Sequence, residues 1–248
     1  MIKIRQIEIG SGMPKICVPI TGRTMEAIEQ QAKTISEYDV VDIVEWRVDY
    51  ADFIENYESV KAALVKLRAL LGEKVLLFTF RTAGEGGEKV ITANDYYALN
   101  RFATGTGLVD MIDIEMFLQE EGLGSYIDMI HSMGCKVILS NHDFTKTPDE
   151  QDIVDRLCKM EQVGGDILKI AVMPNSPMDV VTLLGATCKA GAMVKQPVVT
   201  MSMAKLGTVS RVTGEIFGSA ITFGTIGKES APGQVPVEQL SSYLQIFH

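Results

Sequence analysis

Short apolar runs recur along the whole chain, and an amphipathic stretch follows most of them. Within the runs the hydrophobic positions are nearly continuous, which is typical of strands buried on both faces of a parallel sheet. The runs cover residues 15–20, 40–49, 74–82, 108–116, 136–144, 166–174, 197–203 and 220–227. We therefore predict eight parallel strands that alternate with helices.

The stretches between the runs place apolar residues at i, i+3 and i+4, which is the spacing of one face of an α-helix. This spacing predicts helices over residues 24–38, 58–71 and 148–163. The third stretch opens with Pro148 and then Asp149, and both residue types suit the first turn of a helix.

Eight alternating strands and helices predict an α/β fold of the (β/α)8 TIM-barrel type, as a single catalytic domain over residues 1–248. A doubly wound open sheet is the alternative. Against it, the segment after the first strand reads PITGR over residues 19–23 and is not a glycine-rich phosphate loop. The glycines of residues 84–89 lack P-loop spacing and favour a flexible acidic loop.

The N-terminal segment alternates polar and apolar residues over positions 2–9 and is followed by the sequence GSG. We expect an extra strand or hairpin here that closes the bottom of the barrel. The segment lacks the apolar core of a signal peptide, and no apolar run in the chain reaches the length of a membrane span. These features predict a cytoplasmic protein with no membrane partner.

The charge balance narrows the choice of ligand. The formal net charge is −9, so the surface repels phosphate backbones and we expect no nucleic-acid partner.

The four cysteines form no CxxC pair, which disfavours a zinc site of that kind. Cys17 and Cys135 lie in or beside apolar runs, and we expect them to be small core residues.

Polar and charged residues interrupt five of the runs near their C-terminal ends. They are the EWRVD segment at 45–49, Arg81, Asp113 with Glu115, the SNHD segment at 140–143, and Lys169. The active sites of TIM barrels lie at the C-terminal ends of the strands. Because five strands deviate at the same end, we predict an active site there.

The alternation of side chains along a strand indicates which residues face the barrel mouth. Glu45 and Arg47 share one face, and we expect both to point inward while Trp46 packs against helices. Lys169 lies opposite the larger aliphatic residues of its run, which suit the helix side. Those residues are Leu168, Ile170 and Val172.

His142 ends the strand before the one that holds Lys169, and neighbouring parallel strands lie about 4.8 Å apart. Each residue alone has an ordinary structural interpretation, as a hydrogen-bonded histidine or as a lysine paired with Glu45 or Glu115. Together the two residues favour a catalytic role, because both side chains can reach one small molecule.

A lysine amine attacks a carbonyl carbon only when it is unprotonated, and an apolar wall and nearby cations favour that form. We therefore predict that Lys169 forms a Schiff base with a ketone or aldehyde, whose protonated form withdraws electrons from the adjacent carbon. His142 is the candidate base that removes a proton from that carbon, and Glu85 is the candidate that orients His142. The alternative for Glu85 is a solvated loop acid.

Three arginines near the mouth, Arg47, Arg81 and Arg211, predict an anionic and oxygen-rich ligand, since guanidinium groups suit carboxylates. The loop over residues 228–236 contains glycine and two prolines and is a candidate lid. Its Ser230 and Gln234 are expected to supply uncharged hydrogen bonds.

Met201 and Met203 share a strand face. They either form an apolar floor under a carbon ring or simply fill the core.

The motifs EWRVD, FRT, EGGE, SNHDF, LKIAVMP, MSMAKLGTVSRV and SAPGQ, taken in this order, resemble type I 3-dehydroquinate dehydratases. The resemblance covers nearly the whole chain, although the N-terminal segment carries no matching motif. It implies a homodimeric TIM barrel that needs no metal or cofactor. It also implies dehydration of 3-dehydroquinate to 3-dehydroshikimate, a step of aromatic amino acid biosynthesis.

The resemblance also implies a role for each candidate residue. Lys169 would be the Schiff-base lysine, His142 the proton carrier and Glu85 its partner. The ring hydroxyls would be held by Glu45, Arg47 and Arg81, and the carboxylate by Arg211 with Ser230 and Gln234.

Two alternative functions stay open. A Schiff-base aldolase on this fold would need a glycine-rich phosphate site after the seventh and eighth strands, where the chain offers Arg211, Ser230 and Gln234. A noncatalytic barrel that binds hydroxy acids is the other alternative.

Overall fold

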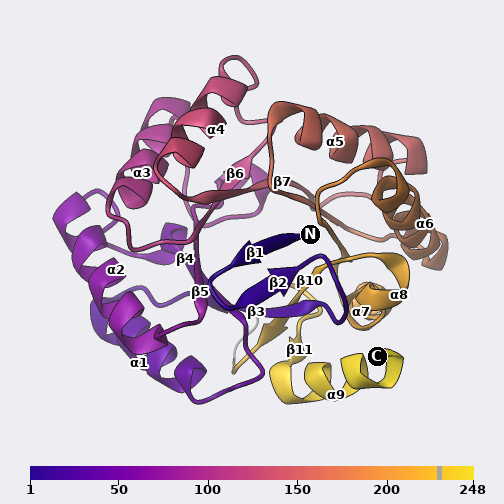
Figure 1. Ribbon diagram of the computed structural model, residues 1–248, viewed down its shortest axis with the longest axis horizontal. Helices are drawn as coiled ribbons and strands as arrows, with labels where there is room; N and C mark the ends of the chain where they lie inside the picture. Colours follow the sequence, from indigo (N-terminus) through magenta and orange to yellow (C-terminus); the bar gives the residue numbers. More distant parts are fainter. Residues whose placement is uncertain (228–230) are drawn as a thin grey trace.

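Parallel strands form a closed barrel with helices around its outside, in a computed structural model that describes residues 1–227 and 231–248 (Figure 1). The barrel strands are β3 (Lys15–Ile20), β4 (Ile43–Arg47), β5 (Val75–Thr79), β6 (Met111–Glu115), β7 (Lys136–Asp143), β8 (Ile167–Val172), β9 (Val198–Ser202) and β10 (Ile221–Thr225). They pair in parallel in the order β10, β3, β4, and on through β9. Each of the eight predicted strands is confirmed.

The two ends of this sheet meet beside β9 and β10. Val198 forms a parallel bridge with Ser219, and the N–H of Ala220 donates to the carbonyl of Val198 at 2.8 Å. This closure confirms the predicted TIM barrel and excludes the alternative of an open doubly wound sheet.

Helices follow the barrel strands and cover the outside of the sheet (Figure 1). They are α1 (Met25–Ser36), α2 (Tyr57–Leu71), α3 (Ala93–Gly105), α4 (Leu123–Ser132), α5 (Glu150–Val163), α6 (Pro177–Met193), α7 (Thr208–Val212), α8 (Gly214–Phe217) and α9 (Val237–Phe247). Short 3-10 helices and one further strand complete the described elements. They are η1 (Val48–Tyr50), η2 (Ala83–Glu85), η3 (Lys205–Gly207) and β11 (Val235–Pro236), which pairs in parallel with β10.

The sequence sets where the helices begin. The Thr24 side chain caps α1 by accepting from the N–H of Ala27. At α6, Ser176 and Asp179 form a reciprocal capping box, and Pro177 occupies the first turn. The three predicted helices correspond to α1, α2 and α5 within two residues at each end. Within the described part of the chain, no helix has both the length and the apolar character needed to cross a membrane.

The two faces of the barrel strands belong to two separate apolar clusters. Trp46 and the outward residues of β8 pack in the cluster between strands and helices, as predicted. Ile167 and Ala171 lie in the second cluster, inside the barrel, together with Cys17. Lys169 stands between these two inward residues on β8 and therefore points into the barrel, as the alternation predicts.

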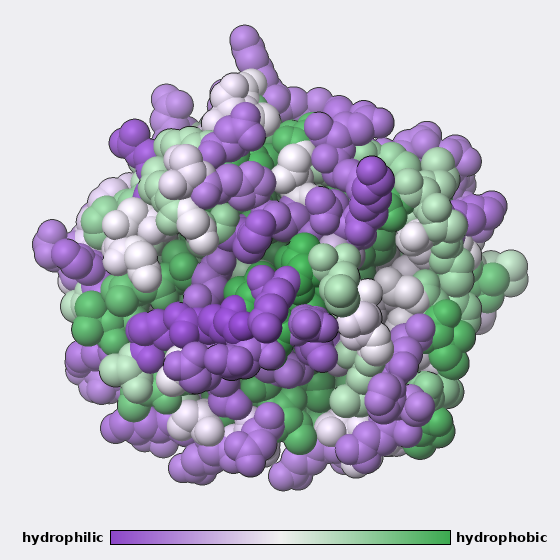
Figure 2. Space-filling view, in the orientation of Figure 1, coloured by the Kyte–Doolittle hydropathy of each residue, from purple (hydrophilic) through white to green (hydrophobic). Residues whose placement is uncertain are grey.

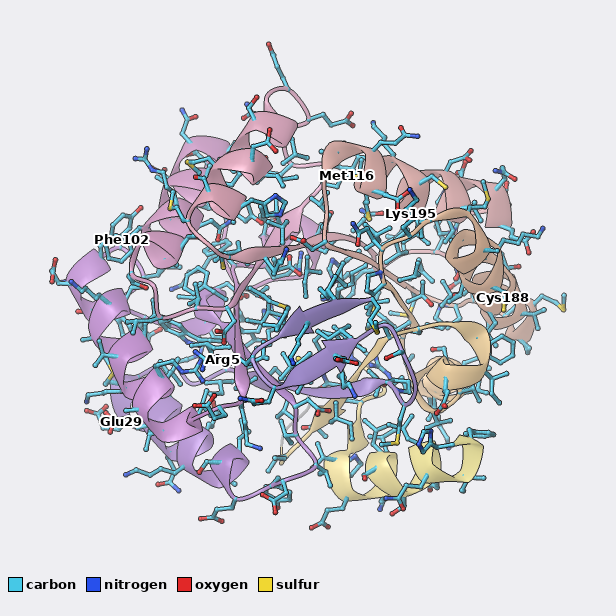
Figure 3. The ribbon with its side chains drawn as sticks, in the orientation of Figure 1. Arg5, Glu29, Phe102, Met116, Cys188 and Lys195 are labelled. Carbon is cyan, nitrogen blue, oxygen red and sulfur yellow. The ribbon has the colours of Figure 1, made fainter. Side chains whose placement is uncertain are left out.

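The N-terminal residues form an antiparallel hairpin of β1 (Ile2–Ile4) and β2 (Ile7–Ile9), which crosses in front of the barrel in Figure 1. Ile4 and Ile9 join the cluster inside the barrel, so the hairpin closes the bottom as expected. Figure 2 shows hydrophilic side chains across this end of the molecule. Arg5, at the edge of the hairpin in Figure 3, donates to Asp110 at 2.7 Å and holds the hairpin to the barrel.

Candidate active site

A small cavity of about 50 Å³ lies at the C-terminal ends of the barrel strands. Its lining comes from barrel strands, from the turn after β5 and from the segment after β10. The residues are Glu45, Arg47, Arg81, Glu85, Gly86, His142, Phe144, Lys169, Ala171, Met201, Met203, Arg211, Phe223, Ala231 and Gln234. Ten of the eleven site residues expected from the sequence thus lie around one cavity, and the eleventh, Ser230, falls outside the described residues.

A larger cavity of about 680 Å³ lies on the outside of the barrel, near the start of α2 and α3. Its lining includes Ile54, Phe80 and Leu99 but no histidine, and the ammonium of Lys89 there donates to the carbonyl of Ala51. The smaller cavity in the barrel mouth is lined by Lys169 and by the pair of His142 and Glu85, which are groups able to act as nucleophile, base and acid. We therefore assign the candidate active site to the barrel mouth.

Lys169 is almost fully buried, with 4% of its surface exposed. Its Nζ atom lies 3.6 Å from Oδ2 of Asp113 and 4.6 Å from the centre of the Phe223 ring. The sequence interpretation considered Glu45 and Glu115 as ion-pair partners, whereas the described partner is Asp113. The signal for Asp113 was present in the sequence, since an acid at this position of β6 shares the inward face with Glu115.

His142 and Glu85 form the second functional pair. Nδ1 of His142 lies 2.9 Å from Oε2 of Glu85, and the same oxygen accepts the backbone N–H of His142 at 3.0 Å. Glu85 ends the short helix η2, after which Gly86 adopts a left-handed φ of 84°. A Cβ atom on Gly87 would lie 1.9 Å from the carbonyl oxygen of Arg81. The segment expected to be a flexible loop is therefore a tight turn that carries Glu85 to His142.

Burial shifts the proton affinities of this pair. It lowers the pKa of His142 well below its ordinary value, and the cations of Arg81 and Lys169 lower it further. Burial also raises the pKa of Glu85 to about 7, against the opposing effect of the Arg81 cation. His142 is therefore a neutral imidazole at neutral pH, which is the form that accepts a proton.

Two residues that the sequence interpretation missed hold Glu85 in place. Asn141 donates from Nδ2 to Oε1 of Glu85 at 3.1 Å, and Arg156 donates from Nη1 to Oδ1 of Asn141 at 2.9 Å. Asn141 lies in the SNHD segment of β7, directly before His142, but Arg156 lies on α5 outside the barrel. Strand alternation gives no indication that a helix residue reaches this network.

The arginines of β4 and the segment after β5 are already paired with acids. Arg47 donates to both carboxylate oxygens of Asp49, at 2.8 and 2.7 Å. Arg81 donates to Asp113 at 2.7 Å and to Glu115 at 2.9 Å. These pairs hold the guanidinium groups rigidly, and their charge is largely compensated, which suits hydrogen bonds to neutral hydroxyls.

Arg211 lies on α7 with only 1% of its surface exposed, and it lines the cavity. Its guanidinium donates to the carbonyls of Phe223 at 3.4 Å and Pro232 at 3.2 Å. Gly233, with φ of 80°, lies so close to Ala204 that a Cβ atom would be 2.4 Å from its carbonyl oxygen. The described part of the final loop is therefore packed against the barrel mouth.

Met201 and Met203 belong to the apolar cluster inside the barrel, and both line the cavity. They fill the core, as one of the two interpretations expected, and they also form part of the apolar wall of the cavity. Among residues 1–227 and 231–248, no group of three or more His, Cys, Asp and Glu side chains is arranged to hold a metal ion.

Comparison with known proteins identifies close relatives. A family model described as type I 3-dehydroquinase matches residues 16–248. The 3-dehydroquinate dehydratase of Listeria innocua is 46% identical over 247 residues, covering 100% of this chain and 98% of the relative. The enzyme of that name from Clostridioides difficile is 46% identical over 248 residues, covering 100% of this chain and 97% of the relative.

Solved structures agree with these relatives. A crystal structure of type I 3-dehydroquinate dehydratase from Clostridium difficile, with covalently modified comenic acid, matches with a TM-score of 0.96 and 46% identity, covering 100% of this chain and 97% of that one. The 3-dehydroquinate dehydratase of Enterococcus faecalis matches with a TM-score of 0.93 and 40% identity, and each chain is covered completely.

Proposed function

The chain belongs to the type I 3-dehydroquinase family of hydro-lyases, and we propose that it dehydrates 3-dehydroquinate to 3-dehydroshikimate through an imine on Lys169. The observation that carries this proposal is the placement of Lys169 and His142 around one buried cavity. Ser140, two residues before His142, pairs in register with Lys169 across β7 and β8. The two side chains therefore reach a bound ketone from neighbouring strands.

The first step joins the substrate to the enzyme. The unprotonated amine of Lys169 attacks the ketone carbon of 3-dehydroquinate and forms a carbinolamine. One amine proton moves to the oxygen and a second proton comes from solvent, after which the C–O bond breaks and the oxygen leaves as water. The product is a protonated imine with its positive charge on the lysine nitrogen. This cation draws electrons from the neighbouring carbon and so acidifies the C2 proton.

The second step removes water from the ring. His142, a neutral base in its buried setting, takes the C2 proton, and the electron pair forms an enamine. The enamine then expels the hydroxyl that is β to the original carbonyl, and His142 returns the proton to the departing oxygen. Hydrolysis of the product imine releases 3-dehydroshikimate and restores the Lys169 amine.

The remaining cavity residues have roles in binding. The cation of Arg211 pairs with the substrate carboxylate, and Gln234 and Ser230 assist it. Glu45, Arg47 and Arg81 hold the ring hydroxyls, which fits the prior pairing of both arginines with acids. Met201 and Met203 support the carbon ring.

The alternatives are less well supported. An aldolase on this fold would act on a phosphorylated substrate through glycine-rich loops after the last two strands, whereas the chain has Arg211 and Gln234 there. The similarity to 3-dehydroquinases also argues against an aldolase.

Following the family resemblance, we also propose that the chain works as a homodimer. Sedimentation at about twice the chain mass of 27.2 kDa would support the dimer.

Turnover by a Lys169→Ala variant tests the proposed function. Mixing the wild type with 3-dehydroquinate should produce the absorbance of a conjugated product, and the variant should keep its fold but lose this activity. Lys146→Ala, which removes an exposed lysine after β7, is the matched control and should behave as the wild type. Silence of the wild type would favour a binding protein, and substantial activity of Lys169→Ala would rule out the covalent route.

A further inference from the structure

Asp113 is completely buried in the barrel, with 0% of its surface exposed, and only one of its two carboxylate oxygens is hydrogen-bonded. Oδ1 accepts from Nη2 of Arg81 and from Oγ of Ser140, both at 2.7 Å. Oδ2 has no hydrogen-bond donor among the residues that the structure describes. This second oxygen lies 3.6 Å from Nζ of Lys169.

A buried carboxylate oxygen without a donor is unfavourable unless a cation compensates its charge. The guanidinium of Arg81 is shared, because it also donates to Glu115 and Glu85. The lysine nitrogen is therefore the cation that Oδ2 faces. The two hydrogen bonds to Oδ1 hold the carboxylate in this orientation and leave Oδ2 directed at Lys169.

We propose that Asp113 is the counter-ion of the cationic nitrogen on Lys169 and keeps the substrate imine protonated during turnover. This inference rests on the proposed function, because it requires an imine at Lys169. No proton passes to Asp113: its carboxylate stays ionised beside the lysine nitrogen and beside the iminium that forms there.

Other ionisable groups surround Lys169 and Asp113 and contribute to the electrostatic potential at this pair. Asp113 forms the ion pair with Lys169 in the described structure, and Glu45 instead accepts from the hydroxyl of Thr79 at 3.0 Å. The surrounding groups are Cys17 on β3, Glu45 on β4, Arg81 and Glu85 after β5, Glu115 on β6, Tyr96 on α3 and His142 on β7.

The proposal predicts a change in pH dependence that a merely structural role does not produce. A carboxylate within about 4–6 Å of a cation shifts the proton affinity of that cation by about 1–3 pKa units. In Asp113→Asn the imine should lose its proton at lower pH, so the alkaline limb of kcat should move down by about that amount. Trapping with borohydride, which reduces the protonated imine, should weaken over the same range.

Glu115→Gln is the matched control, because it also removes one negative charge from Arg81 but has no contact with Lys169 in the described structure. Ser140→Ala is a second control that loosens Oδ1 and keeps the charge. Both controls are expected to keep the wild-type position of the alkaline limb, whatever their overall rates. An Asp113→Asn variant with an unmoved limb and wild-type trapping would overturn the inference.

Two further results keep the test decisive. If Asp113→Asn shows no cooperative thermal unfolding, the inference is tested on the wild type alone. An equal yield of the borohydride-reduced adduct at about pH 7 and about pH 9 supports Asp113 as the counter-ion. A large fall in that yield between the two pH values overturns the inference. If the wild type traps no adduct at any pH, both the imine and the counter-ion are wrong. Failure of the proposed function is thus distinguished from failure of this inference alone.

Discussion

One carboxylate oxygen of Glu85 contacts His142 twice, since it lies 2.9 Å from Nδ1 of the imidazole and accepts the backbone N–H of His142 at 3.0 Å. The two contacts hold both the ring and its strand end. With Glu85 ionised, Nδ1–H donates to it and Nε2 is the nitrogen that accepts the substrate proton. The protonation state of Glu85 therefore determines whether Nε2 of His142 is available to accept the substrate proton.

The first prediction concerns the pH dependence of the rate. Because the pKa of Glu85 is raised to about 7, its carboxylate is lost as the pH falls through that value, and kcat should fall with it. Glu85→Gln cannot titrate, so this acid limb should disappear and the rate should be lower at every pH. Glu88→Gln, in the same turn but paired with Arg23, is the control that should retain the limb.

The same shift has a consequence for stability. The folded-state pKa of Glu85 lies above its ordinary value of 4.5, so the stabilisation from its protonated form is present at low pH and is lost as the pH rises through about 7. Glu85→Gln should therefore unfold at a higher temperature than the wild type above pH 7. An unchanged acid limb together with unchanged stability would show that Glu85 is not a perturbed acid.

The second prediction concerns His142. His142→Ala should still form the imine with 3-dehydroquinate, but kcat should fall by about 10²–10⁴-fold because no side chain removes the C2 proton. His131→Ala is the control, since His131 is on α4 and contacts Asp166 instead. Single-turnover mixing with mass detection of the adduct separates binding from chemistry. Near-normal turnover of His142→Ala would discard it as the proton carrier.

The third prediction concerns the carboxylate of the substrate. Arg211→Ala removes a charge-assisted hydrogen bond and should raise KM by about 10- to 100-fold, with a smaller effect on kcat. Arg101→Ala, which removes an exposed arginine of α3, should leave both constants unchanged. Steady-state kinetics of the two variants is sufficient, and an unchanged KM in Arg211→Ala would place the carboxylate elsewhere.

Much of this site follows from strand periodicity. A continuous apolar run interrupted by one lysine indicates both a buried strand and, through alternation, the face on which Lys169 lies. The same reasoning places Glu45 and Arg47 inward and Trp46 outward, as the two apolar clusters and the cavity confirm. Alternation works here because each barrel strand has one face toward the helices and one toward the interior.

Periodicity gives the face of a residue but neither its height across the barrel nor its partner. It therefore did not show that Lys169 faces Asp113 and not Glu45 or Glu115. The turn that brings Glu85 to His142 depends on the close approach of Gly87 to Arg81, which no repeating pattern signals. The support of Asn141 by Arg156 comes from a helix outside the barrel and has no counterpart in strand alternation.

The most direct test of the account is borohydride trapping of the wild type with 3-dehydroquinate, followed by proteolysis and peptide mass mapping. The account predicts one reduced adduct, on the peptide that contains Lys169, and none on that peptide when the substrate is omitted. An active enzyme that yields no adduct, or an adduct on a different lysine, would contradict it.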